Sequence, residues 1–554
     1  MKERYFDLME KALSAYTDEH IKSYFERVKA EGLSEHGFPR LTVNIGILIC
    51  HGRRTDLLPL FREMMHFCVE EIPVKKAHND FSVREVIFCL WEVEKSGILP
   101  KEETDYWREK LASIEPYSCY SCRTREKNDP NPKLHNWAIF NSLAEYVRGK
   151  AGLCEPDEYI DIQLSTQMKW IDENGMYRDA IVHPPIVYDL VPRGLLSMLL
   201  HFGYRGEYYE EIDAALRKAG LLTLDMQSVT GELGFGGRSH GFVHNESWIT
   251  LVCAFEAARY KREGNMALAA RFMTAAHRAL DAVERWLSTE NIRHIKNRYP
   301  IDSGYGCEVY AYFDKYMITA ASFLYASYLL TDDTIPYDKD APLGDAVCVT
   351  SADFHKVFLR KGSYALEFDN NGDPHYDASG LGRVHKVGVH SAVCLSCPCP
   401  PYKANYVTEE GAAPLSICPG VLIETGEAVF ATLSPHTLLS LTDNTAVFSC
   451  EAEGKTLTAA YTVSEDGVTV TVKGEGKVAL LLPAYAFDGE KETAIEAKEK
   501  SLTVSYEGSE CRCETDGTVV DAGFFGANRN GRYHGFYACG EERLTVKIAL
   551  GSAR

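Results

Sequence analysis

The chain has 554 residues, more than one compact core normally holds, so its length predicts two domains. A hydrophobic content of 45% and a charged content of 25% are ordinary for a globular protein. The formal net charge of −20 argues against a general binder of nucleic acid or of anionic membranes. It still permits an anionic small substrate, which needs only a local basic cluster.

The N-terminal residues and the cysteines bear on the compartment. The first twenty residues predict a charged amphipathic helix without the apolar core of a signal peptide, and no apolar run is long enough to span a bilayer. Seventeen cysteines without the spacing of a small disulfide framework fit reduced thiols. We therefore expect a cytoplasmic protein with no membrane partner. The oligomeric state, a homo-oligomer included, is left open.

Helical periodicity dominates the chain from Tyr5 to about Leu330. It predicts twelve helices, at residues 5–30, 38–51, 56–71, 81–95, 101–114, 136–150, 155–171, 192–202, 207–222, 246–263, 267–290 and 313–330. Short connections follow the even-numbered helices and longer ones precede them, so every second helix points the same way and the long loops gather at one pole. The even-numbered helices are also the more apolar, as expected of an inner ring. Residues 1–330 are therefore predicted to form an (α/α)6 toroid. An open solenoid is disfavoured because no repeated signature is present.

The sequence pattern changes after Leu330. Residues 331–343, TDDTIPYDKDAPL, predict a linker. From residue 344 to 554, short runs of alternating polarity are separated by turn signals such as KG, NNG, EDG and GEG, which is typical of antiparallel strands. The simplest arrangement is an antiparallel β-sandwich. The expected fold is thus multidomain α + β, with the helical domain first.

The stretch from Thr230 to Trp248, TGELGFGGRSHGFVHNESW, is the most unusual of the long loops. It places five glycines among histidines, glutamates, an arginine and an asparagine, and it leads into a helix. Glycines let a backbone approach a ligand closely. Loops of this mixed polar and aromatic composition usually bind something. The duller alternative is a solvated loop that only caps the following helix at Asn245.

Five loops at the same pole combine aromatic rings, carboxylates, amides, histidines and arginines. Aromatic faces stack on sugar rings, and arginine suits a uronate carboxylate, so this combination predicts a saccharide cleft. The predicted substrate-binding residues of these loops are Asp80, Arg84, His135, Asn136, Trp137, Arg238, His240, His244, Asn245, Tyr310, Tyr312 and Lys315. Three of them, Arg84, Arg238 and Lys315, are candidates to hold a substrate carboxylate. Each of these three could equally be only an ion-pair partner.

Glycoside hydrolysis needs two carboxyl groups that flank the bond, one as acid and one as base or nucleophile. The predicted pair is Glu246 and Glu308, each in a polar, aromatic segment just outside an inner helix. Which of the two is the acid is left open. The structural alternatives are a charge at a helix N-terminus for Glu246 and a loop salt bridge for Glu308. Asp80 and Asp314 are reserves that could equally be helix N-caps.

A uronate lyase would use different residues. β-Elimination needs a base for the C5 proton, an acid at the leaving oxygen and a group that neutralises the carboxylate. Tyr310 or Tyr312, His240 or His244, and Asn136 could fill these roles. A third alternative is a non-catalytic glycan-binding protein, which would keep the aromatic rings without requiring the two glutamates.

No metal and no cofactor are expected. CYSC at Cys119–Cys122 and CLSCPC at Cys394–Cys399 have zinc-like inner spacing, but they fall in different predicted domains. His240 and His244 do not form the helical His-Glu-x-x-His pattern of zinc hydrolases. GELGFGG lacks the Lys-Ser/Thr that follows a phosphate loop.

Four motifs taken together resemble a known family. They are HNWAIFN (135–141), GGRS with HNE (236–239 and 244–246), YGCEVYAYFDKYM (305–317) and LGRVHK (381–386). These residues resemble glycoside hydrolase family 154, the exo-β-glucuronidases, and more distantly the heparinase II/III-like toroid lyases. The resemblance covers both domains. It implies a hydrolase that removes terminal β-glucuronic acid from an oligosaccharide or glycoconjugate without a cofactor. It also draws attention to His385, which could lie on a loop that reaches the cleft, or simply on a basic turn.

Overall fold

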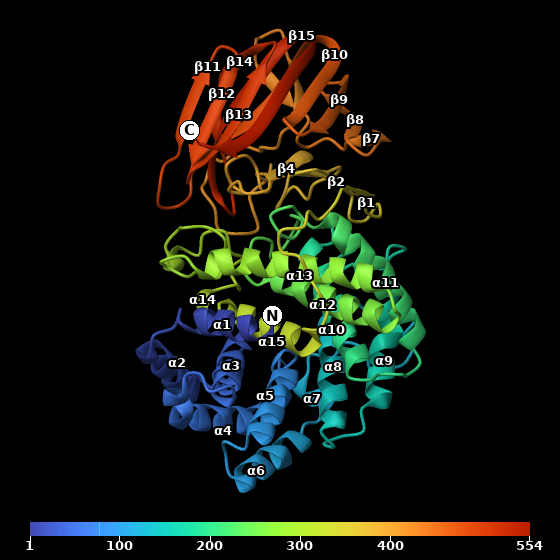
Figure 1. Cartoon of the computed structure of the whole chain (residues 1–554), viewed down its shortest axis with the longest axis vertical. Coiled ribbons are helices and arrows are strands. Elements are labelled where there is room, and N and C mark those ends of the chain that lie inside the picture. Colours follow the sequence, from blue (N-terminus) through green and yellow to red (C-terminus); the bar gives the residue numbers. More distant parts are fainter. Residues whose placement is uncertain (77, 554) are drawn as a thin grey trace.

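The computed structural model describes residues 1–76 and 78–553, so Ala77 and Arg554 lie outside the described residues. A helical half and a strand half are stacked along the long axis (Figure 1). In the described part of the chain, no helix is long and apolar enough to cross a membrane. All seventeen cysteines are free thiols.

Six helices form an inner ring. They are α3 (Gly37–Cys50), α5 (Ser82–Ser96), α8 (Trp137–Lys150), α10 (Ile186–His201), α12 (Asn245–Arg262) and α15 (Thr319–Leu330). Each contacts the next in this order, and α15 contacts α3, which closes the ring. A helix inside such a ring is covered on every side, and residues 37–49 of α3 are accordingly all buried.

Six outer helices pack on the inner ones. They are α1 (Lys2–Leu13), α4 (Leu58–Val74), α6 (Lys101–Ala112), α9 (Asp157–Gln167), α11 (Tyr209–Met226) and α13 (Met266–Leu287). They contact α15, α3, α5, α8, α10 and α12 respectively. In α6 only Thr104, Trp107 and Leu111 are buried, which leaves one narrow apolar stripe and a solvent face. The predicted (α/α)6 toroid is confirmed.

The boundaries of three predicted helices are wrong. The helix expected at 5–30 is divided into α1 and α2 (Asp18–Glu31), because the Thr17 side chain accepts a hydrogen bond from His20 N and caps a new helix. The helix expected at 313–330 is divided into α14 (Phe313–Tyr316) and α15. The helix expected from residue 192 begins at Ile186, because Pro185 rather than Pro192 marks its start. The short α7 (Pro116–Cys119) was not expected.

The C-terminal half contains two antiparallel sheets. The smaller has the order β1 (Ala346–Val349), β2 (Lys356–Lys361), β3 (Tyr364–Asp369), β4 (Gly380–Lys386). The larger has the order β11 (Ala494–Lys498), β12 (Ser501–Tyr506), β13 (Ser509–Thr515), β15 (Gly531–Ser552), β10 (Gly467–Phe487), β9 (Lys455–Ser464), β8 (Thr445–Ala452), β7 (Thr437–Leu441). β14 (Thr518–Asn528) pairs with β15, and β5 (Pro419–Leu422) pairs with β10 and β6 (Ala428–Phe430).

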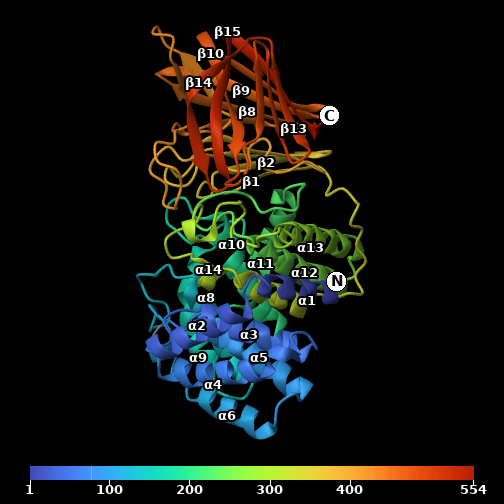
Figure 2. The same cartoon turned by 90° about the vertical axis from the view of Figure 1, so that its left-hand side faces the viewer.

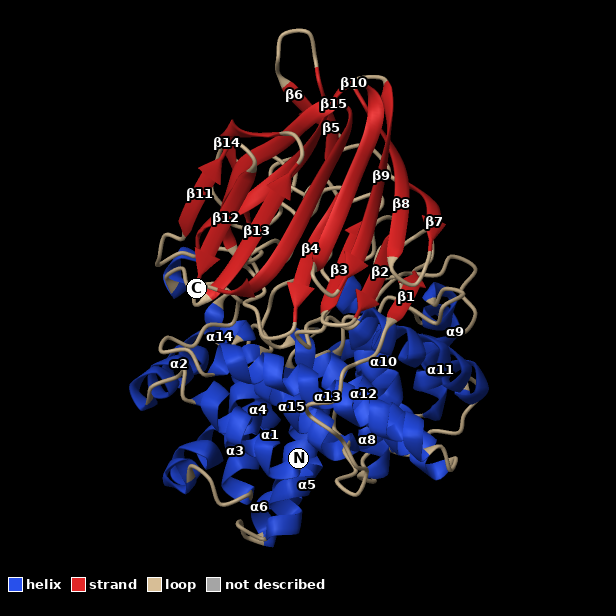
Figure 3. Ribbon diagram, turned by 45° about the horizontal axis from the view of Figure 1, so that its top comes forward, coloured by secondary structure: helices blue, strands red, loops and turns tan. Residues whose placement is uncertain are grey.

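The two sheets share one apolar core, as a sandwich requires. Phe368 of β3 packs against Phe448 and Tyr461 of the larger sheet, with ring centroids 4.8 and 4.9 Å apart. The smaller sheet lies between the larger sheet and the helices (Figures 1 and 2), and β1 and β2 contact α11. The predicted antiparallel β-sandwich is confirmed, with its larger sheet forming the outer layer (Figure 3).

The Thr230–Trp248 segment lies between the two domains. It is almost entirely buried, so it is not a solvated loop. Arg383 of β4 donates to the Leu233 carbonyl at 2.6 Å, and Phe235 N donates to the Glu367 carboxylate of β3 at 3.0 Å. The β domain therefore fixes the path of this segment as it enters α12.

Candidate active site

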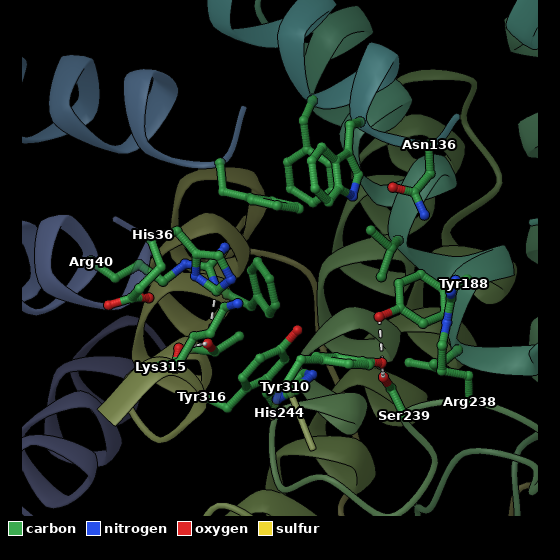
Figure 4. Close-up of a pocket in the computed structure, with 18 of the residues that line it drawn as sticks. His36, Arg40, Asn136, Tyr188, Arg238, Ser239, His244, Tyr310, Lys315 and Tyr316 are labelled. Atoms are coloured by element: carbon green, nitrogen blue, oxygen red, sulfur yellow. Dashed lines mark hydrogen bonds between the residues drawn. The ribbon is translucent and has the colours of Figure 1, made fainter. Parts of the chain in front are cut away.

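A cavity of about 370 Å³ opens where the N-terminal ends of all six inner helices meet (Figure 4). Its size is that of a small-ligand pocket. Every inner helix supplies lining residues, either from its first turns or from the loop just before it. The lining residues are Ser34, Glu35, His36, Arg40, His78, Phe81, Asn136, Trp137, Phe140, Val187, Tyr188, Val191, Arg238, Ser239, His244, Trp248, Tyr310, Lys315, Tyr316, Thr319 and Phe323.

A chain of hydroxyl groups joins Tyr188, Ser239 and Tyr310 on one wall of the pocket. The Ser239 Oγ lies 3.1 Å from the Tyr188 hydroxyl and 3.0 Å from the Tyr310 hydroxyl. Burial raises the pKa of both phenols above the usual value of 10.0. Both tyrosines are therefore protonated near neutral pH and can donate a proton.

His244 lies beside this wall, next to Tyr316. The ring centroid of Tyr316 is 6.0 Å from that of His244 and 6.0 Å from that of Tyr310, so the three rings are contiguous (Figure 4). Burial, together with the nearby Arg40 guanidinium, lowers the pKa of His244 well below 6.5. Among the described residues its Nδ1 has no hydrogen-bond partner. This imidazole is therefore neutral and able to accept a proton.

The opposite wall consists of two cations, Arg40 and Lys315, and of His36, whose pKa is held well below 6.5 by burial and by Arg40 (Figure 4). Arg40 is tied to the Glu85 carboxylate at 2.9 Å and to His36 Nδ1 at 3.1 Å. Within residues 1–76 and 78–553, Lys315 has no carboxylate within 4.0 Å, and burial lowers the pKa of its ammonium group. Lys315 is thus the cation of this wall that is free to pair with a ligand.

Arg238 carries the other positive charge at the pocket, but it is already paired. Its guanidinium bonds the Asp179 carboxylate and lies 4.5 Å from the centroid of the Tyr188 ring. Asn136 Nδ2 donates to the same carboxylate at 2.6 Å. Burial raises the pKa of Asp179 to about 6, against the opposing effect of Arg238. This cluster can hold sugar hydroxyls, and it offers less unneutralised charge than Lys315.

The predicted pair of catalytic carboxylates does not line the pocket. Glu246 is fully buried, and its Oε1 accepts hydrogen bonds from Lys296 Nζ at 2.5 Å and Leu233 N at 3.1 Å. Glu308 lies behind Ser239, where it accepts from Ser239 N at 2.7 Å and from Arg529 Nη2 at 2.6 Å. Each carboxylate is therefore enclosed in an internal ion pair.

Ser239 depends on this support. Its backbone has φ 61°, a left-handed conformation that is uncommon for a non-glycine residue. Its N–H and its hydroxyl are held by Glu308 and by the two tyrosines respectively. Glu308 therefore holds the hydroxyl chain in place through Ser239, and it does not contact a ligand in the pocket itself.

Six of the predicted substrate-binding residues line the cavity: Asn136, Trp137, Arg238, His244, Tyr310 and Lys315. Seven do not: Asp80, Arg84, His135, His240, Asn245, Tyr312 and His385.

The residues outside the cavity are mostly committed to internal bonds. Asp80 accepts from Ser121 N and Asn141, and Arg84 pairs with Glu85. His135 Nε2 contacts the Ser121 carbonyl, and Asn245 donates to the Ser239 carbonyl. His240 is buried, and Tyr312 is 47% exposed. His385 is a correction: it lies on strand β4, with Nδ1 2.8 Å from Ser228 Oγ and Nε2 3.0 Å from Ser396 Oγ. The reserve carboxylate Asp314 pairs instead with Arg27.

Sequence reasoning missed His36, Arg40 and Tyr316. The loop before α3 is short, so it did not stand out beside the long loops at the same pole. One signal was present. Arg40 is the one charged residue in GFPRLTVNIGILIC, and a charge on a buried inner helix indicates a polar centre nearby.

In the described residues, no group of three or more histidines, cysteines and carboxylates is arranged to hold a metal ion. The CYSC residues have other contacts. Cys119 donates to the Ile72 carbonyl, and the Cys122 sulfur lies 2.8 Å from the Tyr159 hydroxyl.

No protein-family model matches this sequence, and a search of curated proteins finds no match. Among solved structures, the chain is similar to the chondroitin AC lyase of Streptomyces coelicolor A3, with a TM-score of 0.47 and 10% identity over 100% of this chain and 80% of that one. A heparinase III has a TM-score of 0.34 and 10% identity, over 89% of this chain and 77% of that one. A polysaccharide lyase has a TM-score of 0.36 and 11% identity, over 59% of this chain and 96% of that one. These TM-scores are low, and the function proposed below therefore rests on the pocket itself.

Proposed function

We propose that the protein is a lyase that cleaves a uronic-acid-containing oligosaccharide by β-elimination. The observation that carries this proposal is the make-up of the cavity. It offers protonated phenols, a neutral imidazole and an unpaired ammonium group, whereas Glu35 is the one carboxylate among its lining residues. That carboxylate already accepts from the Tyr24 hydroxyl and from Gly37 N, each at 2.5 Å.

The proposed reaction assigns one role to each group. The neutral imidazole of His244 accepts the proton from C5 of the uronate. The electron pair of that C–H bond forms the C4–C5 double bond as the C4–O bond breaks. The phenol of Tyr310 donates its proton to the leaving oxygen. Lys315 pairs with the uronate carboxylate, where negative charge develops as the proton leaves C5.

The apolar part of the cavity suits a sugar ring. Trp137 and Phe81, whose ring centroids are 5.2 Å apart, form part of the wall near Asn136. Aromatic faces stack on the apolar faces of sugar rings, and the N-termini of the inner helices favour a negatively charged ligand. The partner that we propose is therefore a short acidic saccharide.

Hydrolysis of a terminal β-glucuronide is the second candidate. Asp179 favours it by its raised pKa, and it lies directly behind the lining residues Arg238 and Asn136, to which it is bonded. With a pKa of about 6, this carboxyl group is partly protonated near neutral pH, as a general acid requires. Glu35 would then be the second carboxylate. The family 154 resemblance points the same way, whereas the enclosed positions of Glu246 and Glu308 speak against them as the reacting pair.

One pair of assays separates the two candidates. Dye release from an aryl β-glucuronide reports hydrolysis, and ultraviolet absorbance from uronate oligosaccharides reports the conjugated double bond of an elimination product. We expect absorbance growth that falls about 10²–10⁴-fold in Tyr310→Phe, as loss of a general acid predicts. Tyr312→Phe is the matched control, since Tyr312 does not line the cavity.

The outcomes are distinct. Dye release without absorbance growth, lost in Asp179→Asn but kept in Tyr310→Phe, would replace elimination with hydrolysis. Absence of both signals, with an oligouronate still bound, would leave a glycan-binding protein.

A further inference from the structure

A second cavity, of about 610 Å³, lies where helix α13 meets the β domain. The helix contributes Arg278, Arg285 and Trp286, and the β domain contributes the turn at residues 387–391 and Glu507. Arg298, from the loop after α13, completes the cationic lining. We call this cavity the α13 groove. It shares no lining residue with the pocket described above.

Helical spacing brings the α13 side chains to one face. Arg278, Arg285 and Trp286 stand at positions i, i+7 and i+8, which lie within one stripe of a helix. Trp286 is only partly buried, so part of its ring is open to the groove. The helix thus presents two guanidinium groups and an indole side by side.

The two arginines of this stripe have no ionic partner in the described part of the chain. Arg278 donates to the Ala341 carbonyl while its buried Nε has no partner, and Arg285 donates to the Thr230 carbonyl at 2.8 Å. The groove's two acids do not pair with Arg278 or Arg285. Asp281 pairs with Arg4 at 2.5 Å, and Glu507 pairs with Lys491 at 3.0 Å and with Arg298 at 3.4 Å.

Arg278 is partly buried and Arg285 is exposed, so both guanidinium groups keep their positive charge at this site, in a chain of net charge −20 where carboxylates outnumber basic groups. Their positive charge is neutralised if an anion binds there. Guanidinium groups bind carboxylates in a bidentate manner, and an indole ring stacks on a sugar.

We propose that the α13 groove is a second binding site for an acidic saccharide, separate from the reaction pocket. The choice of a saccharide rests on the function proposed above, whereas the preference for an anion rests on Arg278 and Arg285 alone. The groove holds one part of a longer acidic chain and raises the affinity for it, without contact with the reacting bond.

Fluorine NMR can follow the two sites separately. Protein labelled with 5-fluorotryptophan has six labelled residues, and Trp286→Phe identifies the one in the groove. Trp137 and Trp248 line the reaction pocket and report on that site. The probe is a hexamer of β-1,4-linked glucuronic acid, kept intact in a Tyr310→Phe background. Cellohexaose is the same chain without its carboxylates.

We expect the Trp286 resonance to shift with the glucuronate hexamer at a concentration roughly tenfold or more below that needed for cellohexaose. The double variant Arg278→Gln/Arg285→Gln should abolish this shift and leave the titration of Trp137 unchanged. Arg271→Gln is the matched control, because Arg271 is exposed on the same helix but does not line the groove.

The proposal is overturned if Trp286 does not respond to the hexamer, if cellohexaose shifts it equally, or if Arg271→Gln has the same effect as the double variant. Its failure is distinguishable from failure of the proposed reaction. A saturating Trp286 shift in a protein without lyase activity supports the groove alone. Elimination activity with a silent Trp286 supports the reaction alone.

Discussion

Replacement of Arg529 by Met is expected to lower the activity, because it removes support for Ser239, although it changes no residue that lines the pocket. Arg529 lies in the turn between β14 and β15 and is 2% exposed. It donates to Glu308 Oε1 at 2.6 Å and to the carbonyl oxygens of Gly306 and Gly237. Glu308 in turn holds Ser239, whose hydroxyl joins Tyr188 and Tyr310.

The burial of the Arg529–Glu308 ion pair determines how much stability and activity the substitution should remove. Removing one partner of a buried ion pair leaves the other charge uncompensated and costs about 3–5 kcal/mol. The Met side chain also leaves two carbonyl groups without their donor. A displacement of about 1 Å in a catalytic group can lower the rate about 10²-fold, so we expect a loss of that order in kcat/KM.

A matched variant separates stability from positioning. Arg148 and Glu145 form another buried pair, with Arg148 Nη1 2.6 Å from Glu145 Oε2 and side chains 1% and 2% exposed, and neither residue lines the pocket. Arg148→Met should lower the urea midpoint by a similar amount and leave kcat/KM of the folded protein nearly unchanged. A folded Arg529→Met protein with the wild-type kcat/KM would refute the reasoning.

Three further predictions concern charge. Lys315→Met should raise KM for a uronate substrate about 10–150-fold, because it removes a charge-assisted contact worth about 1.5–3 kcal/mol. It should leave the binding of a neutral oligosaccharide unchanged. Titration of the protein with both ligands checks this. In a pH–rate profile, a lyase that uses neutral His244 should keep its rate as the pH falls from about 8 to 6, because burial holds the pKa of this imidazole well below 6.5. A hydrolase that needs protonated Asp179 should instead lose rate as the pH rises through about 6. Lys296→Met should lower the free energy of unfolding by about 3–5 kcal/mol, since Glu246 would be left buried without its cation, and urea unfolding measures this loss.

The ring and its functional pole could be predicted because both follow from local patterns. An inner helix must be apolar on every side, and the apolar run from Phe38 onward shows this directly in the sequence. Short connections force neighbouring helices to be antiparallel, and their lengths can also be read from the sequence. The pole then follows from the long loops. Six residues chosen from those loops do line the cavity, Lys315 and His244 among them.

Whether Glu246 and Glu308 line the pocket could not be predicted from local patterns, because each glutamate is bound by a residue that is distant in the sequence. Glu246 meets Lys296, 50 residues away, and Glu308 meets Arg529, 221 residues away in the other domain. The His385 ring is likewise held by Ser228, 157 residues away. A polar residue in a loop looks the same in the sequence whether it faces a cavity or an internal ion pair.

The β domain controls the pocket although every lining residue lies between Ser34 and Phe323. Glu367 of β3 accepts from Phe235 N, and Asp377, in the connection between β3 and β4, accepts from Gly237 N at 2.8 Å, so two parts of that domain fix the segment just before Ser239. Arg529 fixes it from a third side. A toroid without the β domain would lose these hydrogen bonds and the ion pair of Glu308, and with them the contacts that hold Ser239 in its left-handed conformation. The pocket is therefore lined by the helical domain alone, whereas its shape depends on contacts from both domains.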